Sequence, residues 1–407
     1  MSSQVRLRLL PSARCLFDEP VQVKLGGLRS RQVVTMRARS SDDRGVEFSS
    51  LASSRADGDG EVDLDTDPSL GGSYVGVEPM GLLWSMRPHT LHKFFSKNKA
   101  LNPHVVKFSV HQEEGEGEGR MLAEATNERL LMGDGVSRVP VQQGNLRGVL
   151  FTPPGWIRSG PVRAVMDLNT GASEKRAGLL ANRGFVVLTV GVFNDKPSSV
   201  RELQLDRLEE AADFLKRRPQ VGGGGLGVLA RSKAADIALS LAAFVPGVEA
   251  VVWINGCSGS TAALLRLYYG SRLYCQNQCV LPALMHEVGK VTTAESRVHV
   301  VTNTVDSPLA EENRDTLVPI ERAAGHFLFA AAEDDQNWDS KSCMDQMVDR
   351  LKTHRKDNYE SVSYPGAGHL LEPPYGPYCP SGVHILLDQP VLRGGKPRAH
   401  AAAEVHL

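Results

Sequence analysis

The chain has 407 residues, of which 41% are hydrophobic and 23% are charged, and its formal net charge at pH 7 is −1. These fractions lie near the averages of globular proteins and exclude wholesale disorder and a fibrous protein. The length allows two domains with full cores, and the net charge provides no global field that would attract nucleic acid or a membrane surface.

The N-terminal residues, MSSQVRLRLLPSARC, contain arginines but no apolar stretch long enough for a signal peptide. No later apolar run reaches the length needed to span a bilayer. We therefore expect a soluble, intracellular protein. The six cysteines are scattered, and only Cys275 and Cys279 lie close together. Because no second pair and no clustered histidines accompany them, the sequence predicts reduced thiols and no metal site.

Short segments of alternating polarity fill the chain from Val5 to about Val141, separated by clusters of Gly, Asp, Ser and Pro. This spacing is typical of an all-β, immunoglobulin-like sandwich. The acidic glycine run from Glu113 to Arg120 is predicted to be a solvated hairpin loop, since its carboxylates lack the spacing of a calcium loop. The clearest strand candidates are VQVKL (Val21–Leu25), QVVTMRARS (Gln32–Ser40), GVEFSSL (Gly45–Leu51) and VVKFSVHQ (Val105–Gln112).

The pattern changes between Pro140 and Pro154, where apolar strands begin to alternate with helices. Such alternation predicts a mostly parallel sheet covered by helices on both faces. We therefore expect a sandwich domain over residues 1–141 and a second domain over 142–407. Its predicted helices include 173–182 and 200–217, and its predicted strands are RGVLF (147–151), AVMDL (164–168), FVVLTV (185–190), GLGVLA (225–230), EAVVWI (249–254), HFLFAA (326–331) and SVSYP (361–365).

Ser232 stands at a sharp turn between an apolar strand and the helix that begins at Lys233. An α/β hydrolase places its nucleophile at such a turn, although a serine that opens a helix can also be only a cap. Small residues, Ala230 and Ala234, flank it where glycines are usual. The preceding glycines, Gly222–Gly227, match the dinucleotide pattern G-x-G-x-x-G, but they come before the strand. We predict a flexible loop there and no cofactor.

Two further strands end in residues that could complete a catalytic triad. One runs into Asp334 and Asp335, and the other runs into a short turn and His369. The chain order Ser, Asp, His is that of α/β hydrolases. His369 would act as the base for Ser232, and Asp335 would orient it, with Asp334 as an alternative. The competing interpretation is a histidine that only packs in a turn and a solvated acidic strand end.

A transition-state oxyanion needs backbone donors beside the nucleophile. The backbone N–H of Lys233, at the start of the helix, is expected to supply one, because unpaired amides and the helix dipole favour negative charge there. By analogy with other α/β hydrolases, its partner should come from the loop Asn169–Ser173, with Thr170 and Gly171 as candidates.

Seven segments resemble the family of type I acyl-CoA thioesterases and bile acid-CoA:amino acid N-acyltransferases, and together they extend over almost the whole chain. The resemblance implies an N-terminal β-sandwich and a C-terminal α/β-hydrolase domain, with the nucleophile, acid and base at Ser232, Asp335 and His369. It also favours Asp335 over Asp334. The segments are DEPVQVKLGGL (18–28), LGGSYVGVEPMGLLW (70–84), GLLANRGF (178–185), SKAADIALSLAAF (232–244), DDQNW (334–338), YPGAGHLLEPPYGPYC (364–379) and GGKPRAHA (394–401).

The chain departs from the family pattern at the alanines that flank Ser232 and in the shortened segment Asn169–Ser173, and the final helix that family members carry after GGKPRAHA is expected to be missing. Amino-acid transferases of the family resemble one another in having a cysteine nucleophile. A serine favours hydrolysis, because an oxygen ester is less reactive toward amines than an acyl-thioenzyme. The resemblance thus implies acyl-CoA as substrate. The alternatives are an acyl-CoA:amino acid N-acyltransferase and a catalytically weak or inactive acyl-CoA-binding homologue.

Localisation is expected to be cytoplasmic. The terminal Val-His-Leu faintly resembles a peroxisomal address, and the early arginines leave a mitochondrial alternative. Acyl-chain length and oligomeric state have no signal in the sequence.

Overall fold

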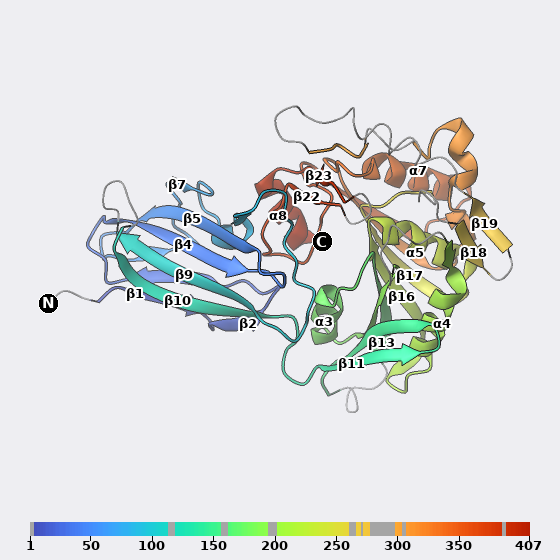
Figure 1. Cartoon of the computed structure of the whole chain (residues 1–407), viewed down its shortest axis with the longest axis horizontal. Helices are drawn as coiled ribbons and strands as arrows, with labels where there is room; N and C mark the ends of the chain where they lie inside the picture. Colours follow the sequence, from blue (N-terminus) through green and yellow to red (C-terminus); the bar gives the residue numbers. More distant parts are fainter. Residues whose placement is uncertain are drawn as a thin grey trace. The chain divides into compact units, whose positions relative to one another are not determined.

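The computed structural model describes residues 4–112, 119–155, 162–193, 202–259, 266–269, 272–276, 298–302, 307–384 and 388–407. Backbone contacts divide the chain into two compact units (Figure 1). The first unit comprises residues 1–131 with 372–379 and 404–406, and the second comprises 132–371, 380–403 and 407.

Two β-sheets build the first unit. The smaller has the order β1-β3-β6, and the larger has the order β2-β10-β9-β4-β5-β7, with β8 beside β5. Strands β4, β5 and β9 alternate buried and more exposed residues, so each presents one face to a core. The elements are β1 (Arg6–Leu10), β2 (Arg14–Leu16), β3 (Gln22–Gly26), β4 (Val33–Ser41), β5 (Glu47–Arg55), β6 (Val62–Asp63), β7 (Gly71–Gly72), α1 (Gly81–Trp84), β8 (Arg87–Pro88), β9 (His104–Gln112) and β10 (Met121–Leu130).

The four strands predicted in this region are confirmed as β3, β4, β5 and β9. Of the acidic glycine run, residues 113–118 lie outside the described residues. At its two ends the N–H of Gln112 donates to the carbonyl of Arg120 at 2.9 Å, so β9 and β10 are paired up to the connection.

The second unit is organised around an eight-stranded mixed sheet with the order β11-β12-β14-β13-β16-β17-β20-β21. The β11·β12 and β12·β14 pairs are antiparallel and all others are parallel. This is the sheet of an α/β hydrolase. Its strands are β11 (Ser137–Gln143), β12 (Leu146–Thr152), β13 (Val162–Asn169), β14 (Val186–Gly191), β16 (Val221–Arg231), β17 (Val248–Ile254), β20 (His326–Ala332) and β21 (Tyr359–Tyr364).

Helices pack on this sheet through apolar side chains. In Figure 1, α3 lies on one side of the sheet and α4, α5 and α7 lie on the other. Helix α4 buries residues at three- and four-residue spacing, whereas α5 is buried almost all round, as expected for a helix at the centre of a domain. The helical segments are α3 (Lys175–Asn182), α4 (Leu205–Lys216), α5 (Lys233–Phe244), η3 (Glu311–Thr316), η4 (Ile320–Arg322), α7 (Ser340–Thr353) and α8 (Pro397–His406).

Short strands outside the large sheet form two smaller sheets. They are β15 (Glu202–Gln204), β18 (Arg266–Tyr269) and β19 (Arg272–Gln276) in one, and β22 (Ser381–Val383) and β23 (Pro390–Leu392) in the other. All seven strands predicted for the second domain are confirmed, and its two predicted helices correspond to α3 and α4. The second prediction, 200–217, is wrong at its start, because Glu202–Gln204 form the strand β15 and α4 begins at Leu205. Residues 200 and 201 lie outside the described residues.

The glycine run Gly222–Gly227 was expected to be a flexible loop, and this prediction is wrong. The run lies inside β16, between its neighbours β13 and β17. The pairing with β13 changes register between Val162 and Ala164, and the pairing with β17 changes register between Leu226 and Gly227. Leu226 and Gly227 pair with both neighbours, whereas Gly222–Gly225 fall within the register shift against β13, where a bulge accommodates the extra residues.

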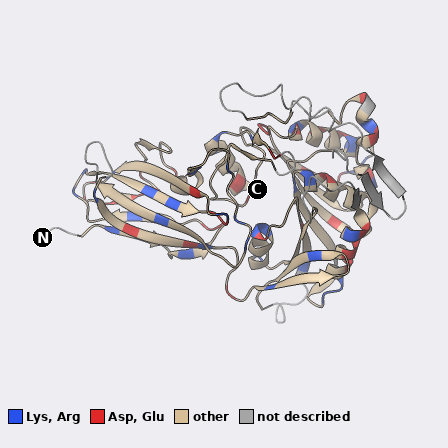
Figure 2. Cartoon of the chain, viewed as in Figure 1, with Lys and Arg blue, Asp and Glu red and all other residues tan. Residues whose placement is uncertain are grey.

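Strand β11 belongs to the eight-stranded sheet, and the second unit begins at Met132. The sequence pattern had placed residues up to 141 with the sandwich, because alternation identifies a strand but not the sheet that it joins. Among the described residues, no helix combines the length and the apolar character needed to cross a membrane. Figure 2 shows basic and acidic residues interspersed over both units.

Candidate active site

Ser232 occupies the turn between β16 and α5. Its backbone has φ 57° and ψ −134°, which a non-glycine residue rarely adopts. Such a conformation costs on the order of 1–3 kcal/mol and persists only where its surroundings impose it. Here the serine N–H donates to the carbonyl of Ile254, at the end of β17, at 2.9 Å. Ala230 and Ala234 are both fully buried, so their methyl groups fit within the packed core around the turn.

Three predicted residues come together at the C-terminal edge of the large sheet. His369 Nε2 lies 2.9 Å from Ser232 Oγ, and His369 Nδ1 lies 2.9 Å from Asp335 Oδ2. His369 and Asp335 are buried, whereas Ser232 is partly exposed. The indole Nε1 of Trp338 lies 3.5 Å from the serine oxygen. The chain of hydrogen bonds from hydroxyl to imidazole to carboxylate is the one that activates a serine for attack.

Asp335 faces the imidazole, and Asp334 does not. Besides His369, Asp335 Oδ2 accepts a hydrogen bond from Ser340 Oγ at 2.7 Å, and its Oδ1 accepts from the N–H groups of Asn337 and Trp338. These donors hold the carboxylate in place.

Asp334 turns toward the segment 393–395 instead. Its Oδ2 accepts from the N–H of Gly395 at 2.9 Å, and its Oδ1 accepts from Gln336 Nε2. The neighbouring Gly394 has φ 75°, and a Cβ there would overlap the carbonyl of Asp334. Glycine is therefore required where this segment approaches the acid loop.

Burial dominates the electrostatics of His369. It lowers the pKa of His369, because the charged imidazolium loses its hydration. The carboxylate of Asp335 opposes this effect, while the positive charges of Arg393 and Arg231 lower the pKa further. The imidazole is therefore neutral at neutral pH, which is the state that can accept a proton from serine.

Arg393 is a site residue that the sequence did not indicate. Its carbonyl accepts from the N–H of His369 at 2.8 Å, and its Nη1 donates to the side-chain oxygen of Asn337 at 2.7 Å when that amide is oriented to donate to Leu392. Burial lowers the pKa of Arg393 to about 10. The residue thus connects the base loop with the acid loop, and no local pattern links positions so far apart in the chain.

The expected oxyanion donors belong to the start of α5 and to the segment after β13. Lys233 is the first residue of α5, and its side chain is paired with Asp236. Strand β13 is hydrogen-bonded beside β16 with Leu168 opposite Ala230. In this register Thr170 follows Leu168 by two residues, as Ser232 follows Ala230, so residues 170–171 leave β13 at the same edge of the sheet as the serine.

A buried ion pair stabilises the start of that loop. Arg176 Nη2 lies 2.8 Å from Asp167 Oδ1, and the same nitrogen donates to Asn169 Oδ1 at 2.8 Å. The Asn169 amide in turn donates to Asp167 Oδ2 at 2.9 Å and to Thr189 Oγ1 at 3.1 Å. Thr189 Oγ1 donates to the carbonyl of Ser173 at 2.6 Å. Both ends of the segment 169–173 are therefore tied to the sheet.

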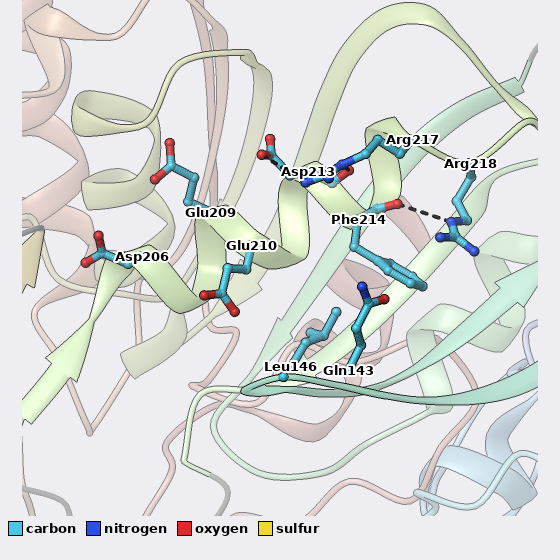
Figure 3. Close-up of a pocket in the computed structure, with 10 residues that line it drawn as sticks. Gln143, Leu146, Asp206, Glu209, Glu210, Asp213, Phe214, Arg217 and Arg218 are labelled. Carbon is cyan, nitrogen blue, oxygen red and sulfur yellow. Dashed lines mark hydrogen bonds and ion pairs between the residues drawn. The ribbon is translucent and has the colours of Figure 1, made fainter.

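A hollow of about 560 Å³ lies elsewhere in the second unit, between α4 and the β11–β12 turn. Its lining includes the carboxylates of Asp206, Glu209, Glu210 and Asp213 of α4 (Figure 3), and Arg218 Nε donates to the carbonyl of Phe214 at 3.2 Å. None of its ten lining residues belongs to the triad, and no nucleophile is among them. It offers a solvated helix face and not a reaction centre.

Comparison with known proteins places both halves of the chain in one group. Residues 203–407 match the family model described as "BAAT / Acyl-CoA thioester hydrolase C terminal", and residues 18–143 match "Acyl-CoA thioester hydrolase/BAAT N-terminal region". Acyl-coenzyme A thioesterase 1 of Homo sapiens is 37% identical over 98% of this chain and 93% of its own length. Acyl-coenzyme A thioesterase 5 of Mus musculus is 38% identical over 98% of this chain and 93% of its own length. The mitochondrial acyl-coenzyme A thioesterase 2 of Homo sapiens is 36% identical over 98% of this chain and 81% of its own length.

Proposed function

Because the chain belongs to the acyl-CoA thioester hydrolase/BAAT family, we propose that it hydrolyses acyl-CoA to a free acid and CoA with Ser232 as nucleophile. The observation that carries this proposal is the unbroken hydrogen-bond chain from Ser232 Oγ through His369 to Asp335, with both links at 2.9 Å. It supplies the base and the orienting acid that a serine hydroxyl needs at neutral pH.

In the acylation step, His369 Nε2 takes the hydroxyl proton while Ser232 Oγ attacks the thioester carbonyl. The tetrahedral intermediate then expels the CoA sulfur, which receives the proton from the imidazolium. Asp335 stabilises that imidazolium and keeps its Nδ1 proton in place. In the deacylation step the neutral imidazole takes a proton from water, which attacks the serine ester. The acid leaves, and the proton returns to Ser232.

The negative oxygen of each intermediate would be held by the backbone N–H of Lys233 together with that of Thr170 or Gly171. The N-terminus of α5 favours negative charge at that point. Support for the second donor comes from the register of β13 beside β16 and from the ion pair that fixes the start of the loop. One such donor is worth about 2.7–4 kcal/mol in the transition state.

Hydrolysis is favoured over transfer to an amino acid because the nucleophile is an oxygen. An oxygen ester resists amines more than a thioester does, and the neutral base is placed to activate water. The thiol released from acyl-CoAs of graded chain length, measured with and without glycine or taurine, tests this choice. We expect a rate that is independent of the amino acid and a free acid as the product. Conjugates as the main product in mass spectrometry would identify a transferase, and binding without thiol release would identify an inactive homologue.

We further propose that the first unit is an immunoglobulin-like β-sandwich and that the chemistry resides in the α/β part. Support comes from the antiparallel β4·β5, β4·β9 and β9·β10 pairs and from the contact between β1 and β10, one from each sheet. Limited proteolysis of the full chain, followed by mass spectrometry, should cut between residues 131 and 137, where the sandwich ends. Cuts within β9 or β10 instead would speak against a folded sandwich.

We also propose a cytoplasmic location. Four described cysteines, Cys15, Cys257, Cys343 and Cys379, are free thiols, which agrees with a reducing compartment. Microscopy of the tagged chain, with and without its last three residues, distinguishes the cytoplasm from peroxisomes and mitochondria.

A further inference from the structure

Asn255 follows the last residue of β17, the strand that lies between β16 and β20 in the sheet. It is fully buried, and its φ of 45° lies in the left-handed region. Asparagine tolerates this conformation better than other side chains with a Cβ, but a buried residue held there needs compensating contacts. The hydrogen bonds of the Asn255 side chain and N–H go to the strand and loop that carry the catalytic acid and base.

The Asn255 carboxamide bridges β20 to the base loop. Its Oδ1 accepts from the N–H of Ala332 at 2.7 Å, and its Nδ2 donates to the carbonyls of His369 at 2.9 Å and Gly368 at 3.3 Å. Its own N–H donates to the carbonyl of Ala330 at 3.0 Å. Ala332 ends β20, from which the chain continues to the acid loop.

The residue before Asn255 contacts the third catalytic segment, since the carbonyl of Ile254 accepts from the N–H of Ser232. Ile254 and Asn255 therefore hydrogen-bond to the backbones of three segments. These are the turn at Ser232, the strand β20 that leads to Asp335, and the loop that carries His369. The base loop follows β21, which is separated from β17 by β20, so the asparagine side chain reaches across one strand.

Loss of the carboxamide would withdraw the acceptor of a buried N–H and two donors to buried carbonyls. Each buried polar group left without a partner costs about 1–3 kcal/mol, and backbone movement relieves that cost. The movement available here is a shift of the base loop away from β20. Both triad distances depend on that loop, and a misplacement of about 1 Å can cost about a hundredfold in rate.

We propose that Asn255 is a positioning residue that holds His369 in register with Asp335 and Ser232. It touches none of the reacting atoms and acts through the backbone of the base. The inference rests on the triad of the proposed function, and it adds a residue outside that triad to the machinery of the reaction.

Asn255→Gly tests the role directly, because glycine adopts a positive φ without strain and removes only the carboxamide. We expect kcat to fall about a hundredfold with KM unchanged, the pattern of an interaction that matters in the transition state alone. Asn358→Gly is the matched control. The Asn358 side-chain amide donates to the carbonyl of Gly325 and so links the residue before β21 to the residue before β20. This link lies at the N-terminal ends of the two strands, opposite to the ends that Asn255 connects. Asn358→Gly should leave kcat near the wild-type value.

Two readouts do not depend on acyl-CoA. The low-field proton resonance of His369 Nδ1–H, bonded to Asp335, should be lost or shifted in Asn255→Gly and retained in Asn358→Gly. Phosphonylation of Ser232 by a fluorophosphonate should be slower in Asn255→Gly and unchanged in Asn358→Gly. If the wild-type enzyme released no thiol from any acyl-CoA, the proposed function would fail, while these measurements would still decide the role of Asn255.

The proposal would be overturned if Asn255→Gly kept the wild-type kcat, the wild-type resonance and the wild-type phosphonylation rate. It would also be overturned if kcat fell equally in Asn255→Gly and Asn358→Gly. Should Asn255→Gly not fold, Asn255→Asp decides instead. It keeps the size and an oxygen for the N–H of Ala332, but it removes the amide donors to the base loop. A reduced kcat with unchanged KM supports positioning, and wild-type kcat refutes it.

Discussion

Arg176→Met should destabilise the second unit and slow catalysis, because it breaks the buried ion pair at the start of the 169–173 segment. Asp167 is fully buried and Arg176 is 8% exposed. The guanidinium makes two contacts to Asp167 Oδ1, at 2.9 Å and 2.8 Å, and also donates to the carbonyl of Leu168 at 3.1 Å. Methionine fills a similar volume but supplies no donor, so the carboxylate is left with the Asn169 amide.

Removing one partner of a buried pair leaves an uncompensated charge and costs about 3–5 kcal/mol. The remaining Asn169 bond places the expected loss at the lower end of that range. Arg217→Met is the control, since Arg217 is paired with Asp213 on the surface, with side chains 74% and 49% exposed. An exposed pair of this spacing on a helix is worth about 0.3–0.5 kcal/mol.

Urea unfolding at constant pH measures both losses, and the double variant Asp167→Leu with Arg176→Met completes the test. Replacing both charges by apolar groups should recover most of the stability lost in Arg176→Met alone. We also expect kcat to fall, by up to about 10²–10³, if the loop after β13 loses its oxyanion donor. Equal losses of unfolding free energy in Arg176→Met and Arg217→Met would refute the reasoning, because burial would then have no influence on the pair.

Three further predictions concern the triad. Ser232→Ala should lower kcat by at least about 10⁴ with unchanged thermal unfolding, and a substantial residual turnover in the thiol assay would require another nucleophile. Asp335→Asn should cost about 10⁴ in kcat through the wrong imidazole tautomer, whereas Asp334→Asn should retain activity; the reverse order would reassign the acid. Arg393→Met removes a positive charge that lowers the pKa of His369. That pKa should rise, so the acid limb of the kcat/KM profile should move to higher pH, and an unmoved or lowered limb would contradict the electrostatic argument.

Most of the second unit could be predicted from local pattern. Apolar runs ended by turns identified its strands, and the apolar periodicity after Ser232 identified α5, because these signals lie within a few residues of one another. The chain order of Ser232, Asp335 and His369 at strand ends was also visible, since parallel strands bring their carboxyl ends to one edge. The family segments extended the same interpretation to the whole chain.

Only the tertiary structure decided which groups meet. From the residues alone, Asp334 and Asp335 were both open as the acid, and the hydrogen bonds of the folded loop turn only the second toward the imidazole. Strand β16 includes Gly222–Gly227, against the local preference of glycine, because Val221 on one side of the run and Leu226 and Gly227 at its end pair with neighbouring strands. Asn255 and Arg393 carried no signal at all. Their importance comes from partners more than 20 residues away in the chain, and sequence periodicity describes only the residues that share one helix or one strand.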